Sequence, residues 1–348
     1  MRTRFSKGYY HEPGIYFGMP FDEYISDWAL GSSDLINLEI SPSTYYWNSN
    51  ANPLRTERET PSLRYGRAIH KAVLEGEEAF KAEYAMKAPP PEPGMLVSLE
   101  DLRAKCEELG LPKSGNKAAL IRRIREAGDT TPIYQEIVDK YEKEAGNRIM
   151  LDPDIYSEVL MASKVIRMNP HLTNAFRSGY PEVSVFFEHL GVPMRARFDY
   201  LKPRAVVDLK SIRNHLRMPW PVAVANAIAR HNYPVQAALY LAARAAAAKF
   251  IAEGRVYGEV PPDQWLEAVA KEQNFCFVWV FYQAEGAPIT KGVIFDEKCE
   301  EFLVANQKII NAVELYKKYI SEFDTDLWIE ASEIDHFSSL SMPMWWGQ

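Results

Sequence analysis

The feature that most constrains the fold of this chain is a pair of alternating stretches near its middle. Apolar and polar side chains take turns from about Val192 to Leu201 and again from about Ala205 to Ile212, and Lys202-Pro203-Arg204 separates the two stretches. A period of two predicts two neighbouring β-strands joined by a tight turn. On the second strand, Asp208 and Lys210 then share one face, while the residues between and beside them point the other way.

Charged side chains on the first strand extend this pattern. Arg195, Arg197 and Asp199 share one face of it. If the polar faces of the two strands coincide, the carboxylates of Asp199 and Asp208 meet the ammonium of Lys210. Two such carboxylates cannot both stay ionised cheaply without a cation, and Mg²⁺ suits oxygen ligands. A lysine beside the metal suits a reaction that needs a proton carrier or a charge clamp.

Two carboxylates and a lysine in this arrangement are typical of the active site of a metal-dependent phosphodiesterase. Two points stay open at this stage. The first alternative is a solvated, salt-bridged sheet face, because charge clusters are often only structural. The second open point is whether Arg195 and Arg197 pair with Asp199 or contact nucleic acid.

The bulk composition is that of an ordinary soluble globular protein. The chain has 348 residues, 47% hydrophobic and 25% charged, which allows one large domain or two smaller ones. Its three cysteines are odd in number and far apart, which favours a reducing compartment. We expect a cytoplasmic protein that does not engage a membrane, because no apolar run has membrane-spanning length. The formal charge of −7 is unusual for a nucleic-acid enzyme, but it leaves room for a local basic groove.

Capping signals and a proline cluster divide the chain into segments. Helices are expected to begin at Ser32 and at Ser41-Pro42, and a third is expected over 62–74, with Leu63, Ile69 and Val73 in the core. We interpret 1–88 and 129–348 as two parts of one domain, 89–95 as a proline-rich linker, and 96–128 as an insert.

The later segments alternate between helices and strands. Further helices are expected over 132–145, 152–168, 220–230, 234–250 and 297–320, and further strands over 182–189, 275–282 and 291–295. The strand over 182–189 carries Glu182 and makes the central pair of strands a three-stranded meander. The tail with Trp345-Trp346 is either a subunit contact or a packed terminus.

The insert has a design of its own. A helix capped by Ser98 ends at Leu109-Gly110, a turn follows, and a second helix over 117–126 places Leu120, Ile121 and Ile124 on its apolar side. The pattern LVSLEDLRAKCEELGLPKSGNKAALIRRIRE resembles a SAP module, a small helix-turn-helix unit that binds DNA. The resemblance implies that five side chains of the insert face phosphate without reading sequence: Lys113, Lys117, Arg122, Arg123 and Arg125. The alternative is a solvated two-helix insertion with ordinary basic surface.

Four motifs outside the insert resemble the PD-(D/E)xK nuclease superfamily, and more narrowly its phage-type RecE (exonuclease VIII) and lambda exonuclease group. They are the helix motif ending in His70, the acidic strand at Asp199, the Asp208-x-Lys210 core, and the helix motif Gln236-x-x-x-Tyr240. Phe198 precedes Asp199, so the literal Pro-Asp pair is absent. The resemblance implies an α/β fold of the α+β type, with a mixed central sheet flanked by helices and a small inserted SAP-like module.

The resemblance also implies roles for single residues. Asp199 and Asp208 would hold Mg²⁺, with Mn²⁺ able to substitute, and the carbonyl of Leu209 and His70 would complete the metal site. Lys210 would orient or deprotonate the attacking water. Glu182 is either a carboxylate of the metal site or a strand-edge acid. Gln236 and Tyr240 either position the scissile phosphate or pack within their helix.

At the level of the whole protein, the resemblance implies an exonuclease acting on double-stranded DNA ends. It would work 5′ to 3′ and leave 3′ single strands for a single-strand annealing recombinase, in the cytoplasm of a bacterial host. Members of this phage-type group form rings, so a homo-oligomer is expected. The alternatives are a structure-specific or nicking endonuclease on the same core, and a DNA-binding factor that has lost its chemistry.

Overall fold

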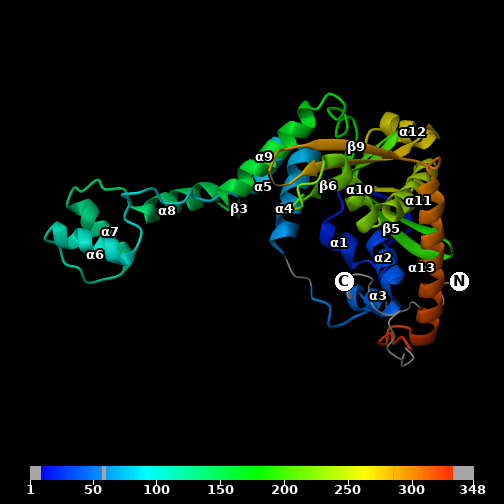
Figure 1. Cartoon of the computed structure of the whole chain (residues 1–348), viewed down its shortest axis with the longest axis horizontal. Coiled ribbons are helices and arrows are strands. Elements are labelled where there is room, and N and C mark those ends of the chain that lie inside the picture. The colour runs from blue at the N-terminus through cyan, green and yellow to red at the C-terminus, as the bar shows by residue number, and fades with distance from the viewer. Residues whose placement is uncertain (1–8, 57–59, 285, 332–348) are drawn as a thin grey trace, which may run out of the picture.

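A seven-stranded mixed sheet forms the centre of the computed structural model, which describes residues 9–56, 60–284 and 286–331. The strands follow the order β7-β1-β4-β5-β6-β8-β9 (Figure 1). Their bounds are β1 Gly14–Phe17, β4 Tyr180–His189, β5 Val192–Lys202, β6 Ala205–Ile212, β7 Val256–Gly258, β8 Cys276–Gln283 and β9 Thr290–Phe295. The strands β4, β5 and β6 form the expected antiparallel meander, and β8 adds to β6 in parallel. The expected mixed sheet flanked by helices is confirmed.

Alternation along β5 explains why the meander is stable. Met194, Ala196 and Phe198 are buried, whereas Arg195 and the other charged residues of the strand are partly exposed. The apolar side chains pack into the main core, so a one-residue slip of register would bury arginines instead of apolar groups.

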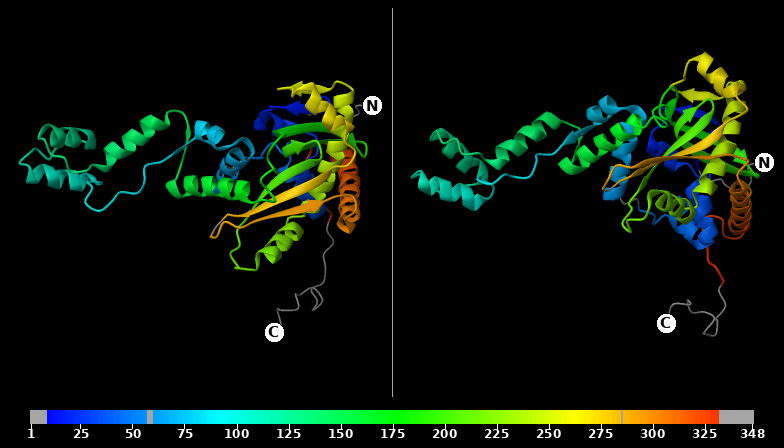
Figure 2. Two further views of the ribbon diagram at one scale, coloured as in Figure 1. Left: turned by 90° about the horizontal axis from the view of Figure 1, so that it is seen from above. Right: turned by 45° about the horizontal axis from the view of Figure 1, so that its top comes forward.

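Helices cover both faces of the sheet (Figure 2). On one face the long helix α11 runs along the strands and packs with α2, α12 and α13 in the main core. On the other face α4 and α9 pack over a second apolar cluster that includes Val207 and Leu209 of β6. The helical bounds are α1 Phe21–Ser26, α2 Ser32–Ile40, α3 Pro42–Asn48, α4 Pro61–His70, a π-helical turn Lys71–Glu75, α5 Glu77–Glu83, α9 Pro153–Met168, α10 Trp220–Arg230, α11 Tyr233–Ala252, α12 Asp263–Lys271 and α13 Glu300–Phe323.

Among the described residues, α11 alone is long and apolar enough to cross a membrane. More than half of its apolar window is buried inside the protein, against the sheet and the neighbouring helices. A helix in this position is a core helix, and its many alanines allow it to lie close to the strands.

The insert forms a separate unit that stands away from the sheet (Figure 1). It contains α6 Leu99–Glu108 and α7 Lys117–Glu126, followed by α8 Tyr134–Ala145. Ser98 caps α6 by accepting from the backbone N–H of Asp101, and Gly110 has the left-handed φ of +70° that ends a helix. The unit has an apolar core of its own, made of Leu102, Cys106, Leu120, Ile124 and Ile133. At its root, β2 Tyr84–Met86 pairs with β3 Ile149–Leu151.

Three expectations about elements need correction or remain outside the described residues. Leu63 is 52% exposed and is not a core residue, whereas Ile69 and Val73 are buried as expected. The helix expected over 62–74 ends at His70 and continues as the π-helical turn. The tail with Trp345-Trp346 lies outside the described residues.

Candidate active site

The expected site residues lie where two neighbouring strands separate. β5 and β6 are paired only through Tyr200–Val207, Leu201–Val206 and Lys202–Ala205. Beyond these pairs β5 stays with β4, and β6 stays with β8 along its whole length. Asp199 and Asp208 are the first residues beyond the last pair. The backbone N–H of Leu209 donates to Asp199 Oδ2 over 2.7 Å, so the carboxylate of Asp199 occupies the fork between the strands.

Asp208 is fully buried, with a hydrogen bond to one carboxylate oxygen and an ion-pair neighbour beside the other. Gln236 donates from Nε2 to Asp208 Oδ1 over 3.0 Å, and Lys210 Nζ lies 2.8 Å from Asp208 Oδ2. Asp208 and Lys210 therefore share a face of β6, as the alternation predicted. Gln236 comes from the first turns of α11, and Tyr240 follows one turn later as a buried ring against Phe198.

The charge on Lys210 depends on these neighbours. Burial lowers the pKa of Lys210, but the carboxylates of Asp208 and Asp199 outweigh burial and raise its pKa above the ordinary value. In the metal-free protein the lysine is therefore an ammonium at neutral pH.

A second group of donors converges beside this pair. His70, Glu182 and Asp199 each offer one ligand atom, and these atoms lie within 4.8 Å of one another. His70 Nε2 is 3.8 Å from Asp199 Oδ2, and His70 Nδ1 is 3.7 Å from Glu182 Oε1. The three residues come from the last turn of α4, from β4 and from β5, so tertiary packing alone brings them together.

The electrostatics of this group show a shortage of positive charge. Burial raises the pKa of Asp199 to about 7, with Asp208 and Glu182 adding to the rise and His70 and Lys210 opposing it. For His70, burial lowers the pKa, but Asp199 and Glu182 raise it to about 9. The protonated imidazole thus supplies a cation to the carboxylates. A nitrogen and several carboxylate oxygens around such a space fit a divalent metal ion in place of that proton.

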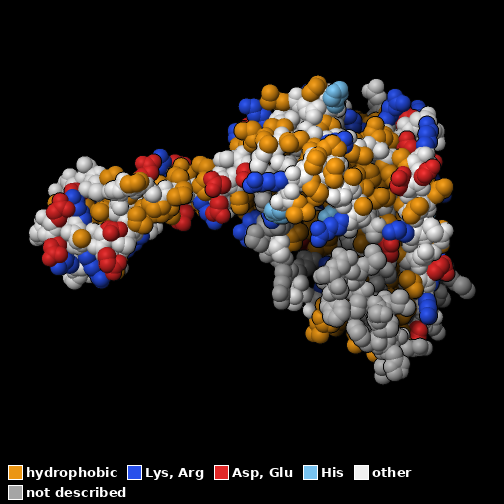
Figure 3. Space-filling view, viewed as in Figure 1, with side chains coloured by type: hydrophobic (Ala, Val, Ile, Leu, Met, Phe, Trp, Pro, Cys, Tyr) orange, Lys and Arg blue, Asp and Glu red, His pale blue; other side chains and the backbone are white. Residues whose placement is uncertain are grey.

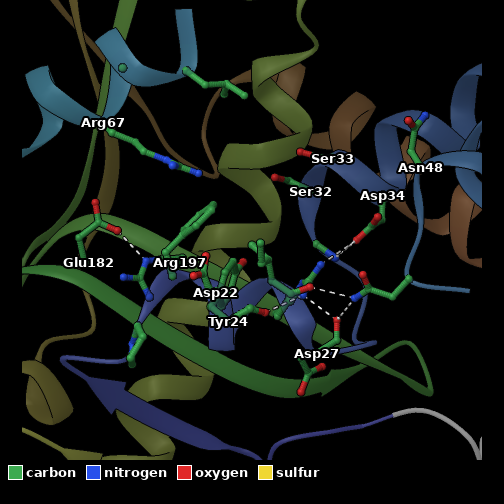
Figure 4. Close-up of a pocket in the computed structure, with 18 of the residues that line it drawn as sticks. Asp22, Tyr24, Asp27, Ser32, Ser33, Asp34, Asn48, Arg67, Glu182 and Arg197 are labelled. Carbon is green, nitrogen blue, oxygen red and sulfur yellow. Dashed lines mark hydrogen bonds and ion pairs between the residues drawn. The ribbon is translucent and has the colours of Figure 1, made fainter. Parts of the chain in front are cut away.

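Glu182 is held in this group by Arg197. The guanidinium donates from Nε to Glu182 Oε2 over 2.6 Å (Figure 4). It also donates from Nη1 to the hydroxyl of Ser184 and to the carbonyl of Met19, both over 2.9 Å. Glu182 itself has a left-handed φ of +53°, which interrupts the pairing of β4 with β5 at this position. The burial of Glu182 raises its pKa, but His70 and Arg197 more than offset burial, and the pKa is lowered.

The structure shows which protein groups the two arginines contact, and their contact with nucleic acid stays a prediction. Arg197 pairs with Glu182 and not with Asp199. Arg195 donates to the backbone carbonyls of Tyr24 and Asp27, and it lies 3.7 Å from Asp34 (Figure 4). Both arginines therefore have structural partners beside the site.

The site opens into a cleft of about 1950 Å³ between α4, the α1–α3 region and the sheet. Members of both site groups line it, among them His70, Asp199 and Gln236. Basic side chains also line the cleft, namely Arg55, Arg64, Arg67, Lys71, Arg195 and Arg197.

The five basic residues expected to contact DNA lie on the insert, away from this cleft (Figures 1 and 3). Arg125 is bound by Glu136 and by the carbonyls of Asp129 and Thr131, and Arg123 donates to the carbonyl of Pro112. These two arginines hold the turns of the insert. The other three basic side chains contact single polar neighbours. Lys113 lies 2.9 Å from Glu107, and Lys117 lies 3.0 Å from Gln135. Arg122 lies 3.6 Å from Glu126 and is 73% exposed.

Two contributors to the site were not identified from the sequence. Ser184 supplies the hydroxyl that accepts a hydrogen bond from Arg197. The only feature of the sequence that points to it is a polar residue within an apolar run. Tyr233 places its ring 5.0 Å from Lys210 Nζ. Its signal is its position three residues before Gln236, which puts both on one side of the helix.

Comparisons with known proteins place the chain in a family. None of the curated proteins matches it. A crystal structure from Eubacterium rectale, described as a "Putative exonuclease", aligns with 76% of this chain and 88% of its own, at 12% identity and a TM-score of 0.33, which is too distant to support an argument. The family model described as "PDDEXK-like domain of unknown function (DUF3799)" matches residues 32–255, which is more than half of the chain and includes both site groups. The chain therefore belongs to this family of PDDEXK-like domains.

Proposed function

We propose that the protein is a divalent-metal-dependent DNA nuclease whose active site is the fork between β5 and β6. One observation carries the proposal: His70, Glu182 and Asp199 converge beside the Asp208–Lys210 pair, at the wall of a large cleft lined by both acidic and basic side chains. The raised pKa of Asp199, which burial and the neighbouring carboxylates cause, supports the proposal because such shifts cluster at functional sites.

The metal site is assigned to His70, Glu182 and Asp199, with Asp208 and the carbonyl of Leu209 as adjoining oxygen donors. Mg²⁺ is the proposed ion and Mn²⁺ its substitute, since both accept carboxylate oxygens and retain waters. When bound, the ion supplies positive charge to the phosphate and acidifies a water molecule. Arg197 keeps the Glu182 carboxylate in place by three hydrogen bonds from its guanidinium to Glu182 and its neighbours.

The lysine and its partners handle the proton and the charge near the reacting phosphate. Gln236 occupies Oδ1 of Asp208 and so leaves Oδ2 to Lys210. This arrangement fixes the ammonium beside Asp208 at the fork, and its proposed role is to hold a phosphate oxygen or the attacking water. Tyr240 lines the cleft beside Gln236, and its ring keeps the helix at a fixed distance from Phe198.

The substrate is proposed to be the end of a DNA duplex, degraded 5′ to 3′ to leave a 3′ single strand. Arg64 and Arg67, exposed on α4 at the edge of the cleft, support a path for one phosphate backbone. Lys113, Lys117 and Arg122 of the SAP-like insert are proposed to contact duplex phosphates outside the cleft. The family resemblance to phage-type exonucleases further supports a single-strand annealing partner in recombination, a ring-shaped homo-oligomer and a bacterial cytoplasmic location.

Digestion of end-labelled DNA tests the polarity and the need for an end. A linear duplex labelled separately at each 5′ and 3′ terminus is digested in Mg²⁺ beside a closed circle of the same sequence. We expect early release of the 5′ label and an untouched circle. Cutting of the circle would replace the exonuclease by an endonuclease on the same site, and release of the 3′ label first would reverse the polarity.

A further inference from the structure

The ammonium of Lys210 has an aromatic neighbour in addition to its carboxylate. The centre of the Tyr233 ring lies 5.0 Å from Lys210 Nζ, while Asp208 Oδ2 is 2.8 Å from the same atom. A cation over an aromatic face within about 6 Å is attracted by the ring electrons, most strongly where water is excluded. Lys210 is only 19% exposed, so this attraction acts at a partly dehydrated site.

The ring of Tyr233 is itself fixed from other directions. His231 stacks on it with ring centres 5.3 Å apart and planes 23° apart, and Phe281 of β8 lies 6.2 Å away. Tyr233 is the first residue of α11, in the same helix as Gln236. One helix therefore brings the partner of Asp208 and the partner of Lys210 to the fork together.

The turn before α11 fixes where the helix begins and therefore where the Tyr233 ring lies. Asn232 has a left-handed backbone, with φ +51°, between the end of α10 and the start of α11. Its side chain donates to Glu39 of α2 and accepts from Lys308 of α13, both over 2.9 Å, and Lys308 lies 2.6 Å from Glu39. These contacts tie the turn to two helices of the main core.

We propose that Tyr233 is a positioning residue, whose ring face holds the Lys210 ammonium against Asp208 in the orientation that the reaction uses. The inference rests on the proposed nuclease function for its effect on rate. The ion pair with Asp208 fixes the distance of the ammonium from one oxygen, but the four-carbon stem of lysine leaves its direction free. The ring restricts the direction of the ammonium from one side. Because the contact is with the ring face, the phenol hydroxyl is not needed for it.

Kinetics of matched variants test the role. In Tyr233→Leu and Tyr233→Met, which keep apolar volume but lose the aromatic face, we expect kcat on linear duplex in Mg²⁺ to fall about tenfold, with KM within about twofold of wild type. In Tyr233→Phe we expect kcat to stay within about twofold. The matched control is Tyr319→Leu, which removes the ring 5.6 Å from Lys318 on α13, a helix with no residue in the cleft lining, and is expected to leave kcat unchanged.

A readout independent of activity follows Lys210 directly. In protein labelled with ¹³Cε-lysine, the signal missing from Lys210→Arg identifies Lys210. We expect this signal to be shifted upfield by the ring in wild type and in Tyr233→Phe, and to move toward the free-lysine position in Tyr233→Leu. Circular dichroism confirms that each variant is folded, and if one of the two apolar variants fails to fold, the other carries the test.

The outcomes separate the inference from the function on which it rests. If wild type does not cleave DNA, the proposed function fails, and the lysine signal still decides whether Tyr233 holds Lys210. If wild type cleaves and the Leu and Met variants keep its kcat, the positioning role is overturned. The role is also overturned if the Phe variant is as slow as the Leu variant, because the hydroxyl and not the face would then matter.

Discussion

Asp199 and His70 are site residues whose pKa values are strongly shifted by the folded structure. The pKa of Asp199 is raised to about 7, mainly by burial, and that of His70 to about 9, where the carboxylates overcome burial. A raised carboxyl pKa means that the folded protein loses stability as pH rises from about 4 to 7. The raised histidine pKa stabilises the folded protein below about 6.5, and this contribution is lost as pH rises through 9. Both effects therefore act in the same direction.

The first prediction follows from these signs. In EDTA, the free energy of unfolding of wild type should fall relative to a His70→Gln/Asp199→Asn double variant as pH rises from 5 to 9, by about 2 kcal/mol or more. Urea unfolding at several pH values measures the difference. Addition of Mn²⁺ at pH 8 should then stabilise wild type and not the double variant. Parallel stability curves for the two proteins would contradict the shifted pKa values.

At the scale of elements, the insert is expected to unfold independently of the sheet. Leu120 is fully buried in the apolar core shared by α6 and α7, which contains no residue of the sheet. The substitution Leu120→Ala should destabilise the insert by about 2–4 kcal/mol. Hydrogen exchange should speed up over α6 and α7 while the strands of the sheet stay protected. Faster exchange in β5 and β6 as well would show that the two cores are coupled.

Elements with a strong local period were predictable from the sequence, and those defined by remote partners were not. β6 and α7 have the expected bounds, because alternation or an amphipathic stripe fills each of them from end to end. β1 and β7 have four and three residues, and their pairing of Ile15 with Val256 spans most of the chain. Leu63 was misassigned because its helix is covered on one side only.

In the site too, local patterns were predictable from the sequence and contacts between remote segments were not. Local alternation predicted that Asp208 and Lys210 share a face, and the structure places them 2.8 Å apart. It could not predict that β5 and β6 separate beside Asp199, nor that Arg197 turns to Glu182. His70 approaches Glu182 only because α4 packs over the sheet, which no local pattern contains.

At the scale of the whole molecule, the two ends of the insert lie side by side, so we expect the rest of the protein to fold without it. The chain enters and leaves it side by side: the Leu96 N–H donates to the Pro132 carbonyl over 2.9 Å, and the Leu96 carbonyl accepts from the Tyr134 N–H over 3.0 Å. α8, with 12 residues, follows the insert and is about 18 Å long at 1.5 Å per residue. Under the proposed DNA-binding role, an insert on such an arm would raise the local concentration of duplex near the active site.

The third prediction concerns this arm. Replacing 97–131 by a short Gly-Ser bridge should lower the affinity for long duplex about tenfold or more and reduce processivity. Cleavage of short duplexes in Mg²⁺ should persist, because the site residues all lie outside the insert. A triple variant with Lys113, Lys117 and Arg122 changed to Gln should reproduce the loss of affinity. A folded deletion protein without any cleavage would refute this division of labour.

The most direct test of the central claim compares Asp208→Asn with a matched acid on the same sheet. Asn keeps the shape and the acceptor for Gln236 but removes the charge that holds Lys210, while Glu188→Gln changes an exposed acid of β4. We predict that wild type and Glu188→Gln release nucleotides from a linear duplex in Mg²⁺ and not in EDTA, and that Asp208→Asn, folded by circular dichroism, is at least about 10³-fold slower. Equal cleavage by Asp208→Asn, or no Mg²⁺-dependent cleavage by wild type, would contradict an active site at the fork between β5 and β6.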